Sequence, residues 1–384
     1  MSDTADKIAD TILEKYDSLP AKYKPSKDSN QVSNWIPLSG IVLEDDHGHL
    51  ECVSLATGMK CLPATKIPLA RGRILHDSHA EILALRAFNH FLLQECIRLT
   101  KDKSQESRFL ATTSNLGLLF TINHGIKIHM YCSEAPCGDS SMELVMSKQD
   151  DPTPWTVIDH NEQLLGRGHF SKLGIVRRKP SRPDSPETLS KSCSDKLALK
   201  QCMGLLSSHT SCFISPENAY LTSLVVPESQ YISAAMERCF GRQGRLAALN
   251  ESSWPADYTF RPFRVLTTAK EFRYSRRSVS SGGNAAKGSN LATIWDPESQ
   301  EVIINGVLQG RKQTEDKCAS MVSRSRLVTQ ASNFTINNLF TDTTSYTAYK
   351  RSHPQLVKRA EVKAKVIQQA LTGWVANVED SFNI

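Results

Sequence analysis

Two periods of hydrophobic residues alternate along the chain, and each predicts a different kind of element. From Asp3 to Leu19 apolar side chains recur at helical spacing, and the pattern ends at Pro20. Residues 35–43 and 50–57 are typical of strands, and the polar turn between them carries two histidines. We expect an N-terminal packing helix, then a β-hairpin whose turn histidines bind no metal.

A further helical pattern begins beside another histidine. Asp77 and Ser78 are good helix caps, and the apolar residues that follow them recur at mostly helical spacing. This pattern predicts a helix in whose first turn both His79 and Glu81 lie.

An alternating segment precedes a cysteine. Residues 126–131 alternate apolar and polar side chains, which predicts a strand, and a turn ending at Pro136 follows. Cys137 then stands before a run of residues that open helices well, 138–141. A thiolate at a helix N-terminus is stabilised by unpaired amides and the helix dipole, so this place suits a metal ligand.

A long polar stretch at residues 147–190 contains a basic run, 177–179, and several prolines. Proline fixes backbone angles and removes hydrogen-bond donors, so the stretch predicts an inserted surface loop beside the active site. Two interpretations stay open for it: a solvated connection, or a contact loop for nucleic acid.

The C-terminal half contains one more linker-like stretch and further elements. Residues 278–289 are rich in Ser and Gly, which predicts a flexible segment within the domain. Residues 292–295 and 302–305 predict a second β-hairpin, and residues 357–371 predict a helix, which a simple interpretation makes amphipathic with a solvated basic face.

Composition sets wider bounds. A chain of 384 residues with 40% hydrophobic content can build a substantial core, and we expect one enlarged domain over residues 1–384. The sequence has no leader pattern and no apolar stretch of membrane-spanning length, so we expect a soluble intracellular protein of the cytoplasm or nucleus. Its ten cysteines should then be free thiols. The net charge of +6 is compatible with an RNA partner but decides little.

Three residues could hold a catalytic zinc ion, which keeps three protein ligands and leaves one position for water. His79, Cys137 and Cys193 have suitable chemistry, and Glu81 could be the carboxylate that moves protons beside the water. The compact cysteine pair of many deaminases is missing, because Ser140 stands three residues after Cys137. The alternative is an ordinary helix histidine and buried thiols.

Three separated motifs favour the zinc interpretation: HAE at His79, PCGD at Pro136 and SCSDK at Ser192. In these motifs, and in SGIVL, GMKCL and the C-terminal GWV, the chain resembles the adenosine deaminases that act on RNA. The resemblance implies an α/β (α+β) fold with a cytidine-deaminase-like core, a mixed sheet flanked by helices and enlarged by C-terminal elements. It also implies that the three candidate residues are zinc ligands and that Glu81 is the proton shuttle.

The same resemblance implies a buried structural cofactor, inositol hexakisphosphate, whose phosphates would pair with cations that are costly to bury alone. The residues that match its binding site in the family are Arg86, Lys196, Tyr346, Lys350, Lys363 and Trp374. Three expected cations are absent, since Leu85, Leu199 and Thr329 stand in their places. The site should therefore be less basic than in the double-stranded RNA editors.

Within the family the chain is most similar to the tRNA-specific adenosine deaminases, because the resemblance leaves no room for a double-stranded RNA binding domain. It implies a tRNA substrate, deaminated beside the anticodon at position 37 of alanine tRNA, with the target base flipped out of an unpaired loop. Lys60 matches a substrate-contacting lysine, and Asp184 is the nearest equivalent of a residue that fills the space of the flipped base. The alternatives are another structured RNA, a free nucleoside or cytidine, and a non-catalytic RNA-binding subunit.

Overall fold

The central sheet is built from strands that are buried on both faces, as expected where helices cover a sheet from both sides. The computed structural model describes residues 2–27, 34–102, 104–113, 117–147, 172–179, 185–255, 257–280, 287–332 and 345–384. Its strands are β1 (Leu38–Glu44), β2 (Leu50–Thr57), β3 (Met59–Cys61), β4 (Asp77–His79), β5 (Leu110–Thr112), β6 (Phe120–Ile122), β7 (Lys127–Cys132), β8 (Ser223–Pro227), β9 (Arg264–Thr268), β10 (Leu291–Trp295), β11 (Gln300–Ile304) and β12 (Val307–Leu308).

The main sheet is mixed and has eight strands in the order β12-β11-β10-β2-β1-β7-β8-β9. The pairs from β12 to β7 are antiparallel, whereas β7, β8 and β9 run parallel. Two small antiparallel pairs, β3-β4 and β5-β6, lie outside it. This arrangement confirms the α/β class with a cytidine-deaminase-like core.

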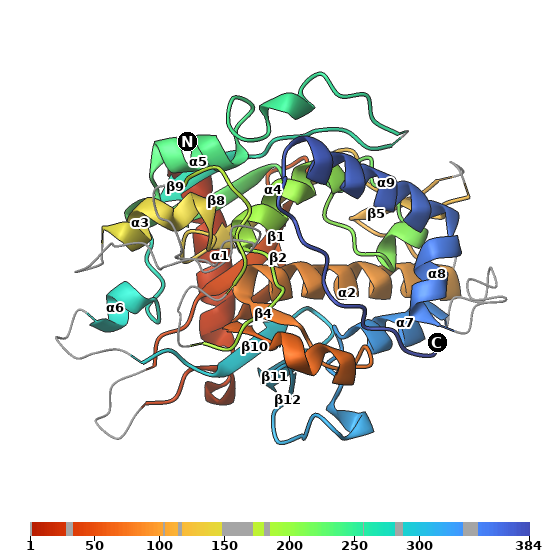
Figure 1. Ribbon diagram of the computed structural model, residues 1–384, viewed down its shortest axis with the longest axis horizontal. Coiled ribbons are helices and arrows are strands. Elements are labelled where there is room, and N and C mark those ends of the chain that lie inside the picture. The colour runs from red at the N-terminus through yellow and green to blue at the C-terminus, as the bar shows by residue number, and fades with distance from the viewer. Residues whose placement is uncertain are drawn as a thin grey trace.

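Helices flank the sheet on both sides (Figure 1). The α-helices are α1 (Ser2–Ser18), α2 (Ala80–Lys101), α3 (Met142–Met146), α4 (Cys193–Met203), α5 (Ser233–Phe240), α6 (Arg276–Ser280), α7 (Arg324–Ser332), α8 (Tyr346–Ser352) and α9 (Pro354–Gln369). The short 3-10 helices are η1 (Ala21–Tyr23), η2 (Ala64–Leu69), η3 (Asp139–Ser141), η4 (Thr210–Cys212), η5 (Glu228–Gln230), η6 (Ala247–Leu249) and η7 (Asp316–Cys318).

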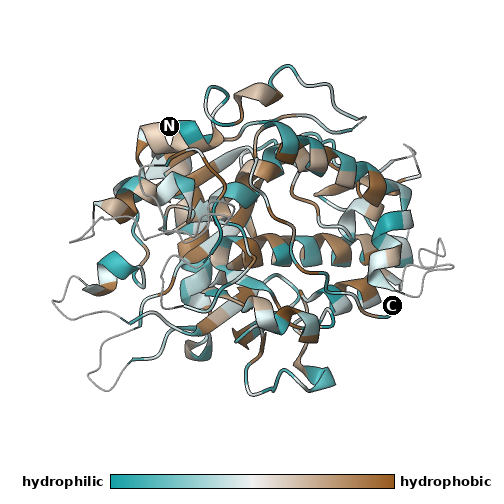
Figure 2. Cartoon of the chain, in the orientation of Figure 1, coloured by the Kyte–Doolittle hydropathy of each residue, from teal (hydrophilic) through white to brown (hydrophobic). Residues whose placement is uncertain are grey.

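The alternation of side chains along β1 divides the core in two. Ile41 and Leu43 join the cluster that packs around α2, whereas Leu38 and Val42 join the cluster under α1. Because successive side chains point to opposite faces of a sheet, α1 and α2 cover opposite faces. Helix α2 runs through the middle of the molecule beside α4, α7 and α9, and apolar residues repeat along it (Figures 1 and 2).

Most of the elements expected from periodicity are present. Helix α1, the β1-β2 and β10-β11 hairpins, strand β7 and helix α9 each lie within a few residues of the expected bounds. The turn histidines His47 and His49 donate backbone N–H bonds of 2.9 Å to the Asp45 carboxylate, as turn residues do. The described helices include none with both the length and the apolar composition to cross a membrane.

Two expectations about loops need correction. The segment 278–289 is not wholly irregular, because α6 extends to Ser280 and Gly288 forms a bridge with Trp35. The segment 147–190 is described only at 147, 172–179 and 185–190. The prediction that its basic run lies on the surface is wrong. Arg177, Arg178 and Lys179 are buried, because their charged groups bond to carboxylate or carbonyl oxygens of the protein.

Candidate metal centre and active site

His79 lies where a short strand turns into the long central helix. Strand β4 pairs with β3, with Met59 opposite His79, and Ala80 donates a backbone hydrogen bond of 2.9 Å to the carbonyl of Gly58. His79 is the N-cap residue of α2 and has an extended backbone. The expected position of His79 inside the first turn is therefore wrong by one residue, and Asp77 is a buried strand residue rather than a cap.

Two cysteines meet through a close contact between their turns. Cys193 is the first residue of α4, and its N–H points at the Cys137 sulfur at 3.4 Å. Between Cys137 and η3, Gly138 has a φ of 109°, and a Cβ there would lie 2.2 Å from the Ser192 hydroxyl. Only glycine tolerates both this close contact and this backbone conformation, so Gly138 allows the PCGD and SCSDK motifs to pack against each other.

The three candidate ligands form a compact triangle. The His79 Nδ1 atom lies 3.7 Å from the sulfur of Cys137 and 3.7 Å from that of Cys193. Tetrahedral zinc with ordinary bond lengths would separate a nitrogen and a sulfur ligand by about 3.6 Å. The ligand atoms of all three residues lie within 4.8 Å of one another, and the donor set therefore fits a zinc ion.

A second group, Cys61, Asp77 and His79, has the same spacing but a different charge environment. Asp77 already accepts hydrogen bonds from two ammonium groups, those of Lys179 and Lys196. These cations would repel a metal ion at that carboxylate. We therefore favour the triangle with two cysteines.

Electrostatics within the site are matched to metal binding and proton transfer. The hydrogen bond with the Cys193 side chain, together with the charges of Lys179 and His79, holds the pKa of the Cys137 thiol well below its usual range, despite its burial. Burial and the neighbouring Cys137 charge raise the pKa of Glu81. Glu81 is 6% exposed, and a raised pKa makes its carboxylate a stronger proton acceptor, which suits a general base.

A buried ionic network supports the ligands. The Lys179 ammonium lies 3.3 Å from the Cys193 sulfur and donates to Asp77 at 2.9 and 3.1 Å. Asp77 also accepts from Ser190 at 2.8 Å and from Lys196. Sequence reasoning missed Lys179, because a basic run before a proline carries no signal of burial.

The residue two places after each cysteine ligand is a buried aspartate held by an arginine. Asp195 accepts from Arg245 at 2.6 Å, and Asp139 accepts from Arg238 at 3.2 Å. Asp139 also accepts the Gly174 N–H at 2.7 Å, which ties the described part of the 147–190 segment to the site. These bonds fix both cysteine turns.

Cations gather beside Lys196, of which Lys191 is buried, Lys363 half-buried and Lys350 exposed. Burial and neighbouring cations lower the pKa of Lys191 to about 7 and that of Lys350 to about 8, and they lower the pKa of Lys363. The ammonium groups of Lys191 and Lys363 each lie 5.5 Å from the Trp374 ring centre. Such mutual repulsion fits a site built to receive a polyanion.

The structure links all six expected polyphosphate residues in this neighbourhood and adds others. Arg86 is partly buried and donates to the carbonyl of Val322, and its charge acts on Tyr346. The cations that sequence reasoning missed are Lys191, Arg324 and Arg359. Lys191 precedes the SCSDK motif directly, a position that could have drawn attention to it.

The positions that lack expected cations are explained by packing. Leu85 and Leu199 are buried in the core cluster around α2, and Thr329 is exposed and donates its hydroxyl to the Ser325 carbonyl. The apolar replacements therefore extend the core instead of lining the cation cluster.

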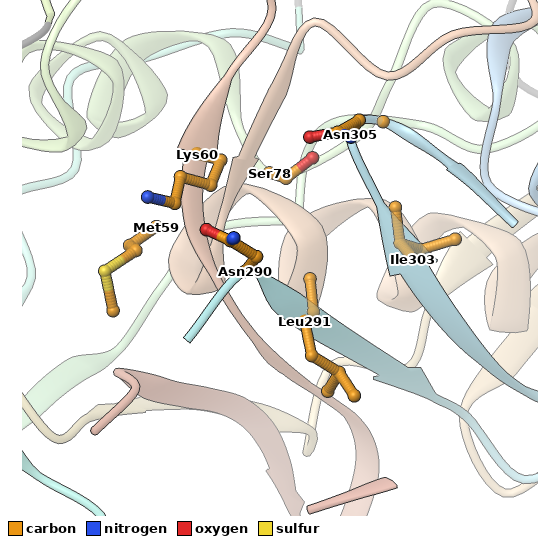
Figure 3. Close-up of a pocket in the computed structure, with 9 residues that line it drawn as sticks. Met59, Lys60, Ser78, Asn290, Leu291, Ile303 and Asn305 are labelled. Carbon is orange, nitrogen blue, oxygen red and sulfur yellow. The ribbon is translucent and has the colours of Figure 1, made fainter. Parts of the chain in front are cut away.

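The two expected substrate contacts have different outcomes. Lys60 is exposed on β3, opposite Ser78, and lines an open pocket together with Asn290 and Asn305 (Figure 3). Asp184 lies outside the described residues.

The fold and the site together are those of a nucleobase deaminase, with a histidine, two cysteines and an acidic residue gathered at the starts of α2, η3 and α4. A model of the adenosine-deaminase (editase) domain matches residues 54–378, and the chain belongs to this family. It is an enzyme that deaminates adenosine.

Several curated proteins are similar along most of the chain. The tRNA-specific adenosine deaminase 1 of Schizosaccharomyces pombe is 37% identical, with 99% of this chain and 97% of that protein covered. The Saccharomyces cerevisiae protein of the same name is 32% identical, with 83% and 80% covered. A double-stranded RNA-specific editase of Drosophila melanogaster is 26% identical over 80% of this chain but only 44% of its own length.

Proposed function

We propose that this enzyme converts adenosine to inosine in tRNA by zinc-dependent hydrolysis, at position 37 beside the anticodon of alanine tRNA. The observation that carries the proposal is the His79–Cys137–Cys193 triangle with Glu81 one residue inside the neighbouring helix. The relatives named tRNA-specific adenosine deaminase support the substrate class. The position follows from the motif resemblance.

In this proposal His79, Cys137 and Cys193 hold the metal, which when bound would polarise a water molecule for attack. Glu81 accepts the proton of that water as it adds to C6 of adenine. The same carboxyl group delivers that proton to ring N1, then takes the proton of the new C6 hydroxyl group and passes it to the amine as the C6–N bond breaks, so adenosine and water give inosine and ammonia. The raised pKa of Glu81 suits a group that takes and returns a proton in one cycle.

We further propose that the cation cluster binds inositol hexakisphosphate. Its ligands would be Arg86, Lys196, Tyr346, Lys350, Lys363 and Trp374, joined by Lys191. The lowered lysine pKa values support this assignment, because several ammonium groups share one interior region. A polyphosphate would neutralise them all at once.

The whole chain, 1–384, would then act as one catalytic domain inside the cell, in the cytoplasm or the nucleus, where tRNA is processed. Segments 147–190 and 278–289 would border the RNA. The exposed Lys60, which lines the pocket and lies opposite Ser78, would contact the substrate backbone. Asp184 would fill the space of the flipped base.

The proposal is tested by sequencing unfractionated tRNA after incubation with the purified protein, with the Glu81→Ala variant as control. Inosine at position 37 of alanine tRNA with the native protein alone would support it. Inosine in other RNAs would indicate another structured substrate. A zinc-loaded, folded protein that binds tRNA but makes no inosine would point to a non-catalytic RNA-binding subunit.

A further inference from the structure

Trp35 differs from the other tryptophans in the described residues. Trp254, Trp295 and Trp374 pack against the hydrophobic clusters, but Trp35 is partly exposed and joins none of those clusters. The guanidinium carbon of Arg276 lies 5.9 Å from its ring centre. Because the Trp35 ring does not pack in the hydrophobic core, its presence at this position needs another explanation.

Backbone hydrogen bonds fix the position of Trp35 in the chain. The Trp35 N–H donates to Lys287 at 3.0 Å, and its carbonyl accepts from Ser289 at 2.9 Å. A Cβ on Gly288 would lie 3.1 Å from the Met59 sulfur and 3.6 Å from Cε2 of Trp35. The missing side chain therefore lets the indole lie close to Met59.

This arrangement places the indole beside the active site. Met59 is the residue opposite His79 in the β3-β4 pair. The Gly58 N–H donates to the Pro37 carbonyl, two residues after Trp35, and the Gly58 carbonyl accepts from Ala80. Pro37, two residues after Trp35, is thus about two strand spacings, roughly 10 Å, from the helix start that carries Glu81.

Positive charge surrounds the ring. Arg276 is exposed, and its guanidinium group faces the Trp35 ring. Lys60 follows Met59 in the chain, and Figure 3 shows Met59, Lys60 and Asn290 together on one side of the pocket. Unpaired bases stack on aromatic rings and on guanidinium planes, while neighbouring cations bind the phosphates.

We propose that Trp35 and Arg276 form a stacking platform for an unpaired nucleobase that flanks the target adenosine, with Lys60 facing its phosphate. The inference rests on the proposed function in taking RNA as the substrate. Flipping the target base leaves its neighbour without a stacking partner, and the platform replaces that partner, which lowers the cost of flipping.

The test compares Trp35→Ala and Trp35→Phe on an anticodon stem-loop and on stem-loops with an abasic nucleotide at each position flanking the target. Loss of one base–aromatic stack should lower kcat/KM of Trp35→Ala by about 10-fold to 100-fold on the intact RNA. Trp35→Phe should stay close to the native enzyme. On the RNA whose stacked base is removed, the native enzyme and Trp35→Ala should be equally slow.

The control is Trp254→Ala, because Trp254 is also partly buried with an ammonium group, that of Lys365, 5.3 Å from its ring centre. Its effect should be the same on intact and abasic RNA. A Trp35→Ala defect of equal size on every RNA, or no defect, would overturn the platform and leave Trp35 a structural residue.

Binding separates this inference from the proposed function. A 2-aminopurine at the flanking position should be quenched by the native protein and by Trp35→Phe, but not by Trp35→Ala, whether or not inosine forms. Inosine formation with unquenched 2-aminopurine at both flanking positions would refute the platform alone. Quenching without inosine would refute the proposed function alone.

Discussion

Replacing Asp77 with asparagine should weaken both the fold and the metal centre. The Asp77 carboxylate accepts hydrogen bonds from Lys179, Lys196, Ser190 and the His79 backbone N–H, and it is 7% exposed. The two ammonium groups hold its pKa well below the usual range, although burial acts in the opposite direction. Asparagine keeps the shape but leaves two cations in the interior without their shared anion.

The magnitude follows from the loss of one partner in a buried ionic network. Such a loss costs about 3–5 kcal/mol, because the remaining charge stays buried. For a chain of 384 residues the melting temperature should fall by roughly 4–6 °C. The Lys179 ammonium would also lose the anion that places it 3.3 Å from the Cys193 sulfur. Disturbing a residue that supports a metal ligand lowers metal affinity by about 10-fold to 100-fold.

The assay combines thermal melting with zinc titration against a competing chelator. Asp296→Asn is the matched control, since Asp296 is also buried, lies in the turn between β10 and β11, and has its carboxylate 2.7 Å from the ring of His90, eleven residues after His79 in the chain. The control should lose stability but keep its zinc affinity. An Asp77→Asn protein with native zinc affinity and native melting temperature would refute the role assigned to the network.

Further predictions concern the proton shuttle and the cation cluster. Glu81→Gln should lower kcat by about 10²- to 10⁴-fold. It should leave the melting temperature equal or higher, because burial raises the pKa of Glu81 and so disfavours its charged form. A stable Glu81→Gln variant with native kcat would contradict the proton-shuttle role. The pKa values of about 7 for Lys191 and about 8 for Lys350 lie below the pKa of a lysine in the unfolded chain. Above pH 7 the unfolded chain therefore binds more protons than the folded protein, so the stability of the fold should rise with pH up to about 10. Added inositol hexakisphosphate should raise the melting temperature more at pH 7 than at pH 9, whereas an equal shift at both would contradict binding at these lysines.

Local pattern pointed to His79 and Cys137, because each stands near the border of an element with a strong periodic signal, whereas Cys193 came from its chemistry and the SCSDK motif. Helix α2 and strand β7 are recognisable from spacing alone, and they place His79 and Cys137 at their ends. The strand β4 before His79 was not foreseen, since three residues carry no period. Asp77 was expected to cap the helix, but its carboxylate pairs with Lys179 and Lys196 instead.

The partners of the site could not be found in the same way. Lys179 donates a hydrogen bond to Asp77, which lies 102 positions earlier in the chain. Nothing in the sequence around either residue indicates that the two are partners. Lys191 and Arg324 likewise become neighbours of the expected cation residues only through the packing of α7, α8 and α9 around α4. A basic run in a polar, proline-rich stretch is normally solvated, and only the fold shows that this one is not.

The arrangement of elements explains why such distant residues converge. The β4-β3 pair fixes the start of α2, and the parallel β7-β8 pair directs the chain after β7 toward the start of α4. Ser194 then donates its N–H to the Cys137 carbonyl at 3.0 Å, which links the two cysteine turns through the backbone itself. Because backbone bonds rather than mobile side chains set these positions, the ligand triangle is already close to the spacing that zinc requires, and little ordering remains to oppose binding.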